Sequence, residues 1–133
     1  IIPGFMEKGG QKIAFGIMRG ANQAQAHAQF VSNVVDHGMN IQAALEAPRF
    51  TRRTVEGCSV MIESRLDTAA REKLGAMGHY VDWRAEFSGQ MGGGQAVLVD
   101  RDAGMHYGAS SPRKDGAAIP EADPYFAGTG KGK

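Results

Sequence analysis

The dipeptide Arg19-Gly20 stands where a run with strand periodicity gives way to a run with helix periodicity. A turn from a strand into a helix leaves backbone N–H groups without partners at the start of the helix. Such groups can hold an anion, including the oxyanion that forms during acyl transfer. An ordinary turn that uses glycine for a positive φ is the alternative, and the local sequence alone favours it. Arg19-Gly20 is nevertheless the segment with the strongest claim to a chemical role.

A second glycine-rich segment, Gly92-Gly-Gly-Gln95, precedes an apolar run. A dinucleotide-binding fingerprint follows a strand and opens a helix, and this segment does neither. The pattern therefore favours a structural bend that leads into the next strand.

The stretch Ser110-Ser-Pro-Arg-Lys-Asp-Gly116 combines a proline with charged residues near the end of the chain. We interpret it as an anchor, in which Arg113 and Asp115 tie this loop to the body of the protein by ion pairing. Its role is expected to be structural rather than catalytic.

Four histidines and one cysteine complete the set of reactive side chains. His27, His37, His79 and His106 lack the spacing of a metal-binding set, such as two histidines one helical turn apart. His27 falls on a helix face, where a packed or hydrogen-bonded imidazole is expected. Cys58 predicts a buried, inert thiol, although a Cys–His nucleophile pair that forms only in space stays open. We expect neither a metal nor a cofactor.

Length and composition indicate a single folded domain. A chain of 133 residues buries roughly two thirds of its unfolded surface, and 42% hydrophobic residues are enough for a core. The 15 basic and 14 acidic residues give a net charge of +1, without the basic patch that nucleic-acid binding requires. The lone cysteine excludes an internal disulfide, and no apolar run reaches the roughly 20 residues of a membrane span.

The first residues, Ile1-Ile-Pro-Gly-Phe5, have the pattern of a strand rather than of a signal peptide. We therefore expect a chain that is truncated or processed at its front, with any targeting signal outside it. A periplasmic, secreted or cytoplasmic location stays open.

Apolar periodicity predicts an alternation of strands and helices. Residues 1–7 and 11–18 predict a hairpin around Lys8-Gly9-Gly10, because both turn positions favour a positive φ. Short strands are expected at 59–62, 79–83, 95–100 and 105–109. Arg49–Thr54 is expected to be exposed connecting structure or, alternatively, a polar strand.

Helical spacing predicts three helices. The first spans 23–36 with Phe30, Val31, Val34 and Val35 on its apolar face, and the second spans 41–46 with Asn40 as its cap. The third follows the capping-box spacing of Ser64–Asp67, and its predicted apolar face consists of Leu66, Ala69, Ala70, Leu74 and Met77. Hairpins with helices laid on one face predict an α+β fold.

Three segments together resemble the γ-glutamyltransferase family of N-terminal-nucleophile hydrolases: Gly38–Phe50, Gly94–Asp100 and Ser111–Ala118. The first is the most specific, because a turn, a short helix and an Ala-Pro-Arg-Phe exit stand together. The resemblance extends from Ile2 to Ala118, and residues 51–87 match only in pattern. It implies the C-terminal portion of a four-layer αββα sandwich with antiparallel sheets flanked by helices. Residues 1–126 would form the C-terminal part of a small-subunit domain, and 127–133 a flexible tail.

The resemblance also implies a mechanism. In this family one precursor cuts itself in two, and the new N-terminal threonine acts as nucleophile with its own α-amino group as base. A γ-glutamyl or related acyl group then passes through an acyl-enzyme to water or to an amine acceptor. That threonine would lie upstream of Ile1, so no catalytic residue is assigned in this chain. The expected partners are the large subunit, the N-terminal part of the small subunit and a small acyl-amide substrate.

Only one functional position of the family maps onto this sequence, a glycine pair whose amides bind the oxyanion. Gly20 falls on the second glycine, whereas Arg19 departs from the first. If that position needs a positive φ, Arg19 costs on the order of 1 kcal/mol or more. Its guanidinium could instead bind a substrate carboxylate through two hydrogen bonds. Ser111 is a further departure, since the family usually has an acidic residue there.

Two other functions stay open at this point. One is a non-catalytic structural or interaction module on the same scaffold, which Arg19 and the absent nucleophile favour. The other is an acylase of the same superfamily with another amide substrate. The chain alone is expected to be inactive and to self-associate through an exposed sheet face or strand edge.

Overall fold

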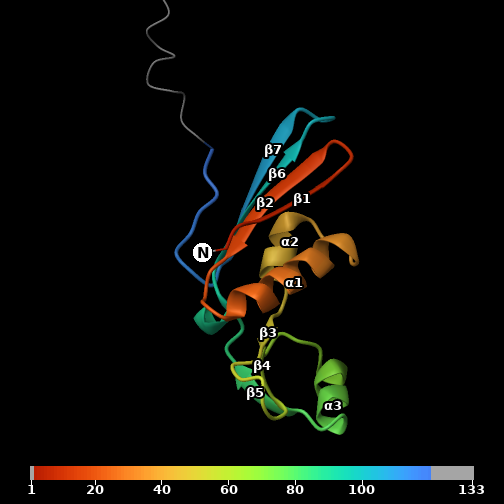
Figure 1. The fold of residues 1–133 in the computed structure, drawn as a ribbon, viewed down its shortest axis with the longest axis vertical. Coiled ribbons are helices and arrows are strands. Elements are labelled where there is room, and N and C mark those ends of the chain that lie inside the picture. Colours follow the sequence, from red (N-terminus) through yellow and green to blue (C-terminus); the bar gives the residue numbers. More distant parts are fainter. Residues whose placement is uncertain (1, 121–133) are drawn as a thin grey trace, which may run out of the picture.

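Two sheets and three helices follow one another along the chain in the order that periodicity predicts (Figure 1). The structure is a computed structural model that describes residues 2–120. Its elements are β1 (Gly4–Lys8), β2 (Gln11–Ile17), α1 (Asn22–Val35), α2 (Ile41–Glu46), β3 (Phe50–Thr51), β4 (Ser59–Glu63), α3 (Thr68–Ala76), β5 (Tyr80–Arg84), the 3₁₀ helix η1 (Gly89–Met91), β6 (Gly94–Asp100) and β7 (Met105–Ser110).

The larger sheet is antiparallel and has the strand order β1-β2-β6-β7. Its first hairpin turns at Gly9 with φ of 59°, so the predicted turn is confirmed. Gly10 does not have a positive φ, contrary to the expectation. A side chain at Gly10 would instead meet the carboxylate of Asp102, which would have to turn away to accommodate it.

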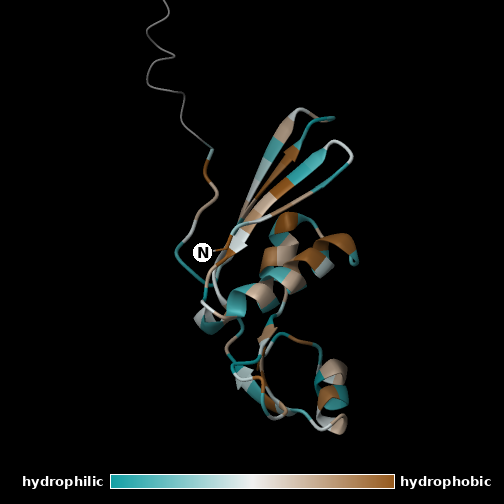
Figure 2. Ribbon diagram, viewed as in Figure 1, coloured by the Kyte–Doolittle hydropathy of each residue, from teal (hydrophilic) through white to brown (hydrophobic). Residues whose placement is uncertain are grey.

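Helices α1 and α2 cover one face of this sheet, and the hydrophobic core lies between them (Figures 1 and 2). Alternate residues of β2 point into the core, as its period of two requires. The buried members are Ile13, Phe15, Ile17, Ala26, Phe30, Ile41, Ala44, Leu45, Ala96 and Ala109. Phe15 and Phe30 join the sheet to α1, with ring centroids 4.7 Å apart.

Within residues 2–120, no helix lies on the opposite face of the larger sheet (Figure 1). Phe5 of β1 is 63% exposed and Val97 of β6 is 46% exposed. Both residues alternate with the core positions of their strands, so their side chains belong to this second face. The sheet therefore has one face that forms the core and one that is largely open, apart from Ala118, which lies over Gly108 of β7.

The smaller sheet has the order β3-β4-β5 and contains a parallel pair, β4 with β5. A parallel pair needs a crossover connection, and α3 supplies it. This pair departs from the antiparallel arrangement expected for the sheets, whereas the mixed α+β class is confirmed.

Four local expectations prove wrong. Helix α3 contains no fully buried residue and Met77 beyond it is exposed, so its predicted apolar face does not form a core. Val35 at the end of α1 is also exposed. The segment from Arg49 is not exposed, since Arg49 and Thr51 are buried, although the alternative of a strand is confirmed by β3. Cys58 is exposed rather than buried.

Two further features concern the ends of the molecule and membranes. The tail predicted at 127–133 lies outside the described residues. Among residues 2–120, no helix is both long enough and apolar enough to cross a membrane.

Candidate functional site

The turn between β2 and α1 contains a strained backbone. Arg19 has φ of 133°, and Gly20 has φ of 52°. Within residues 2–120, Arg19 is the only residue other than glycine with a positive φ. A positive φ of this size is unfavourable for a residue that has a Cβ atom, and it costs of order 1–3 kcal/mol in conformational energy. The predicted departure at Arg19 is therefore accompanied by the strain that a glycine would avoid.

The amides of this turn are free, whereas its carbonyls are not. Asn22 N donates to the carbonyl of Arg19 at 3.1 Å, and Gln23 N donates to that of Gly20 at 3.0 Å. Within the described part of the chain, the N–H groups of Arg19 and Gly20 have no acceptor. Both residues are exposed. Two neighbouring N–H donors at the start of a helix can bind an anionic oxygen.

The glycine-rich loop holds this turn in place. Met18 N donates to the carbonyl of Gly93 at 3.0 Å, and the Asn22 carboxamide donates to that of Met91 at 3.0 Å. Gly92 has φ of 82°, and a side chain there would overlap the carbonyl oxygen of Met18. Two segments singled out from the sequence thus meet in space. The bend expected at Gly92–Gln95 forms after η1 and leads into β6.

The side chain of Arg49 holds the glycine-rich loop in place through its backbone carbonyls. Its guanidinium donates to the carbonyls of Met91 at 3.1 Å and Gly92 at 2.7 Å, and to that of Leu45 in α2 at 2.9 Å. Arg49 is 3% exposed. Burial, and next the positive charge of Arg113, lower the pKa of Arg49 to about 9, although Glu63 opposes the shift. The guanidinium therefore remains charged at neutral pH and keeps all three donors.

Glu63 is the centre of this polar cluster and is 0% exposed. It accepts two hydrogen bonds from Arg113, from Nε at 2.7 Å and from NH2 at 2.5 Å. It also accepts from the backbone amides of Arg49 and Ser88, both at 2.9 Å. Four donors on one carboxylate offset much of the cost of burying its charge.

Arg113 completes the cluster from the C-terminal segment. Its guanidinium donates to the carbonyls of Leu45 at 2.6 Å and Ala47 at 2.8 Å, in addition to Glu63. The predicted anchor is therefore confirmed for Arg113, which pairs with Glu63. Asp115 takes no part, because it is exposed and forms no ion pair within residues 2–120. Ser111 is buried and its hydroxyl accepts from Arg113.

His27 joins α1 to the last residue of β2. Its Nε2 accepts a hydrogen bond from Ile17 N at 2.9 Å, and its ring meets that of Phe15 edge to face at 5.1 Å. The packed, hydrogen-bonded state predicted for His27 is confirmed. Burial, and next the charge of Arg49, lower the pKa of His27.

The other reactive side chains are not brought together. His79 Nδ1 lies 3.4 Å from the carbonyl oxygen of Cys58, so this contact involves the backbone rather than the thiol. In the part of the chain that the structure describes, no group of three or more His, Cys, Asp or Glu side chains could hold a metal ion.

Sequence patterns missed two residues of the polar cluster below the glycine-rich loop, Glu63 and Arg49. Glu63 follows the apolar run Val60-Met-Ile62 of a strand, and an acidic residue at that place is a weak signal of a buried ion pair. The sequence around Arg49 predicts exposure, because two of the carbonyls that it binds lie 42 and 43 residues away along the chain.

Comparisons with known proteins point to one family. The model of the family described as Gamma-glutamyltranspeptidase matches residues 1–121. The chain is 31% identical over 123 residues to the glutathione hydrolase-like YwrD proenzyme of Bacillus subtilis, covering 90% of this chain and 23% of that protein. It is 31% identical over 112 residues to the oxamate amidohydrolase proenzyme of Klebsiella pneumoniae, covering 82% of this chain and 21% of that protein.

A solved structure has the same fold. The transpeptidase CapD of Bacillus anthracis superposes with a TM-score of 0.76 at 22% identity, covering 90% of this chain and 70% of that one. The chain thus spans between a fifth and a quarter of the length of the two relatives it matches in sequence.

The buried carboxylate leads to a prediction on stability. Glu63→Gln leaves the Arg113 guanidinium buried without a counter-charge, so we expect a loss of about 3–5 kcal/mol in the free energy of unfolding. Urea unfolding of this chain measures it. Glu7→Gln is the matched control, because Glu7 pairs with Lys12 at the exposed surface and such pairs contribute about 0–1 kcal/mol. Equal losses for the two variants would contradict the central role of Glu63.

His27 leads to a prediction on pH dependence. Since its folded pKa is lowered, the unfolded state binds a proton first as the pH falls through about 6.5. His27 therefore contributes stability that is full above that value and is lost below it. We expect His27→Gln to reduce the fall in melting temperature between about pH 7.5 and 5.5. If the fall in melting temperature between these two pH values is the same in His27→Gln as in the unaltered protein, His27 is not the titrating group.

Proposed function

Because this chain belongs to the gamma-glutamyltranspeptidase family, we propose that it is the C-terminal part of the small-subunit domain of an amidohydrolase or acyltransferase. The nucleophilic threonine would be supplied by polypeptide that precedes this stretch in the whole protein. Two observations support this assignment. Both relatives are named as proenzymes, and the chain spans only 23% and 21% of their lengths.

The strained conformation of Arg19 carries the proposal of a catalytic turn. A turn that only connects β2 to α1 could relieve φ of 133° by having glycine at this position. Strain of this kind persists where the surrounding structure imposes it, and it gathers at functional sites. The strain favours a catalytic turn over the alternative of a purely structural module.

The role of the turn in the reaction follows from its two free amides. Attack of the threonine hydroxyl on the acyl carbon converts the carbonyl oxygen into an oxyanion, while the hydroxyl proton passes to the threonine α-amino group. The N–H groups of Arg19 and Gly20 would donate to this oxyanion. The C–N bond then breaks, the amine leaves with the proton, and water or an amine acceptor attacks the acyl-enzyme. One such donor contributes about 2.7–4 kcal/mol to the transition state.

The side chain of Arg19 would add a preference for acidic acyl groups. It is exposed at the same turn, so its guanidinium can reach a ligand that is bound to the two amides. A guanidinium binds a carboxylate through two parallel hydrogen bonds. A γ-glutamyl group carries such a carboxylate.

An acylase for another amide is the second candidate. One relative is named an oxamate amidohydrolase, and its sequence identity of 31% equals that of the glutathione hydrolase-like relative. Both reactions would use the same oxyanion turn. Residues of the remaining polypeptide would then select the amide.

The open face of the larger sheet fits the same proposal. Phe5 and Val97 are exposed on it, and an apolar sheet face without a cover is a site of association. In the whole protein, the large subunit and the N-terminal part of the small subunit would bury this surface. In the isolated chain it would lead to self-association.

The missing nucleophile predicts an inactive chain. The 133 residues alone should not release p-nitroaniline from γ-glutamyl-p-nitroanilide above the rate in buffer. The precursor that contains the upstream threonine should release it. Turnover by the isolated chain, abolished when Cys58 is replaced by Ser, would show that the nucleophile lies within these residues instead.

Arg19 predicts a change in KM rather than in kcat. In the assembled enzyme, Arg19→Ala should raise KM for a substrate with an acidic acyl group about tenfold, which corresponds to one lost charge-assisted hydrogen bond. The value of kcat should stay within about threefold, because the backbone amides remain. Arg101→Ala, an exposed arginine in the β6–β7 turn, is the control. If KM is unchanged in Arg19→Ala, the Arg19 side chain does not bind the substrate carboxylate.

A further inference from the structure

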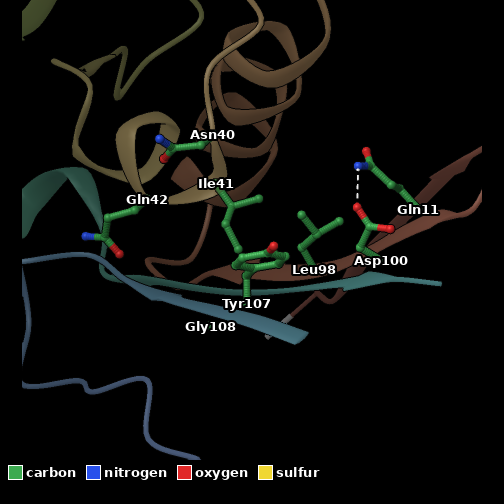
Figure 3. A pocket seen from close by; sticks show the side chains of 8 residues that line it. All are labelled: Gln11, Asn40, Ile41, Gln42, Leu98, Asp100, Tyr107 and Gly108. Carbon is green, nitrogen blue, oxygen red and sulfur yellow. Dashed lines mark hydrogen bonds between the residues drawn. The ribbon is translucent and has the colours of Figure 1, made fainter. Parts of the chain in front are cut away.

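A cavity of about 450 Å³ lies at the other end of β2, away from the Arg19 turn (Figure 3). It is formed by the beginning of α2 and the neighbouring ends of β2, β6 and β7. Gln11 on its wall and Arg19 are eight residues apart along a strand, a distance of roughly 26 Å. Nothing in the proposed acyl transfer uses this cavity.

The floor of the cavity is apolar. Ile41 is 6% exposed, and Leu98 is partly buried against the core. Tyr107 lies opposite Leu98 in the β6–β7 register and is 41% exposed. Figure 3 shows the Tyr107 ring between Ile41 and Leu98, so one side of the cavity is an aromatic and aliphatic surface. Such a surface suits the carbon body of a small ligand.

One wall of the cavity carries a fixed negative charge. The Asp100 carboxylate accepts a hydrogen bond from the Ala103 amide at 2.9 Å. It also accepts one from the Gln11 carboxamide at 3.0 Å, which Figure 3 shows as a dashed line. These two bonds, the Ala103 amide first, lower the pKa of Asp100, so it is ionised at neutral pH. No Lys, Arg or His within residues 2–120 forms an ion pair with it. The Asp100 carboxylate is thus held in place and can still accept further hydrogen bonds from a ligand.

The register brings this charge next to the aromatic ring. Asp100 is two residues beyond Leu98 on the same face of β6, which makes it the diagonal neighbour of Tyr107. Diagonal neighbours of this kind are about 7–8 Å apart. An ammonium group can therefore lie about 3 Å from the carboxylate and within about 6 Å of the ring centroid at the same time.

We propose that this cavity binds a small primary amine with an aromatic body, whose ammonium group lies between Asp100 and Tyr107. The carbon body would rest on Leu98 and Ile41. Anions are disfavoured by the Asp100 charge, and neutral ligands gain less from it than a cation does. The site is independent of the proposed acyl transfer, so either can fail without the other.

Titration of the ¹⁵N-labelled protein with phenethylamine, followed by NMR, tests this site. We expect saturable shifts of amides at the start of α2 and in β6 and β7, with a Kd on the order of millimolar for a ligand of this size. 2-Phenylethanol, which has the same shape without the charge, should bind at least about fivefold more weakly. Nα-acetyl-lysinamide mimics a lysine side chain of another protein. It should also bind more weakly than phenethylamine if the site prefers a small amine with an aromatic body. Equal binding of either compound would overturn the proposal.

Variants and salt separate the charge from the fold. Asp100→Asn keeps the acceptor for Ala103 and should weaken phenethylamine about fivefold, while 2-phenylethanol changes less than about twofold. Asp102→Asn removes the same charge from the same turn outside the cavity and should have little effect. In the unaltered protein, 0.5 M NaCl should weaken only the amine. Shifts outside the cavity, or an amine affinity unaffected by Asp100→Asn, would refute the site.

Discussion

The buried carboxylate of Glu63 is the interaction on which the arrangement of this molecule depends. It lies at the end of β4 and accepts from Arg113 of the C-terminal segment, from the backbone of Arg49 after α2, and from Ser88 before η1. These segments belong to different layers and are far apart in sequence. A buried charge that water cannot reach needs hydrogen-bond partners at defined positions. The Glu63–Arg113 ion pair therefore allows few other arrangements of the segments that supply those partners. The core between α1, α2 and the larger sheet stabilises the fold, whereas this cluster determines how the smaller sheet joins it.

The cluster also controls the strained turn, through a series of backbone contacts. Arg49 holds the carbonyls of Met91 and Gly92, and the same loop then binds Met18 and Asn22 on either side of Arg19. Neither end of the turn can move without breaking a bond to this loop. A conformation that costs of order 1–3 kcal/mol at Arg19 is therefore imposed from outside the turn. The free amides of Arg19 and Gly20 are a consequence of that geometry, because a relaxed turn could direct them towards protein acceptors.

Sequence periodicity was sufficient for most of the secondary structure but not for the polar cluster. The hairpins, α1, α2 and the strands β6 and β7 depend on local alternation, glycine turns and caps, and these appear in short windows. The resemblance at Gly38–Phe50 identified the family without showing what its arginine does. Burial of Arg49 depends on carbonyls supplied by η1 and the following loop, and burial of Glu63 depends on Arg113, which is 50 residues away. Such partners meet only in space, so the sequence predicted Arg113 as an ion-paired anchor but contained only a weak signal for Glu63 as its partner. The prediction for helix α3 was wrong for another reason. The helix lies against the edge strand β5, where Arg71 stacks on the Trp83 ring, and none of its own residues becomes fully buried there.

The two faces of the larger sheet explain why a strained site can be maintained on so short a chain. One face is largely covered by α1 and α2, and the core between them provides most of the stabilisation that a domain of this size requires. Arg19 is not part of that core, so the strain at the turn lowers the stability of the fold without disturbing how the core packs. The other face, with Phe5 and Val97, contributes little until something covers it. Burying exposed apolar area contributes about 25 cal/mol per Å², so its cover would add stabilisation beyond that of the core. Assembly with the rest of the protein can thus offset the strain that the chain carries at its proposed oxyanion turn, and it would do so from the face opposite to the helices.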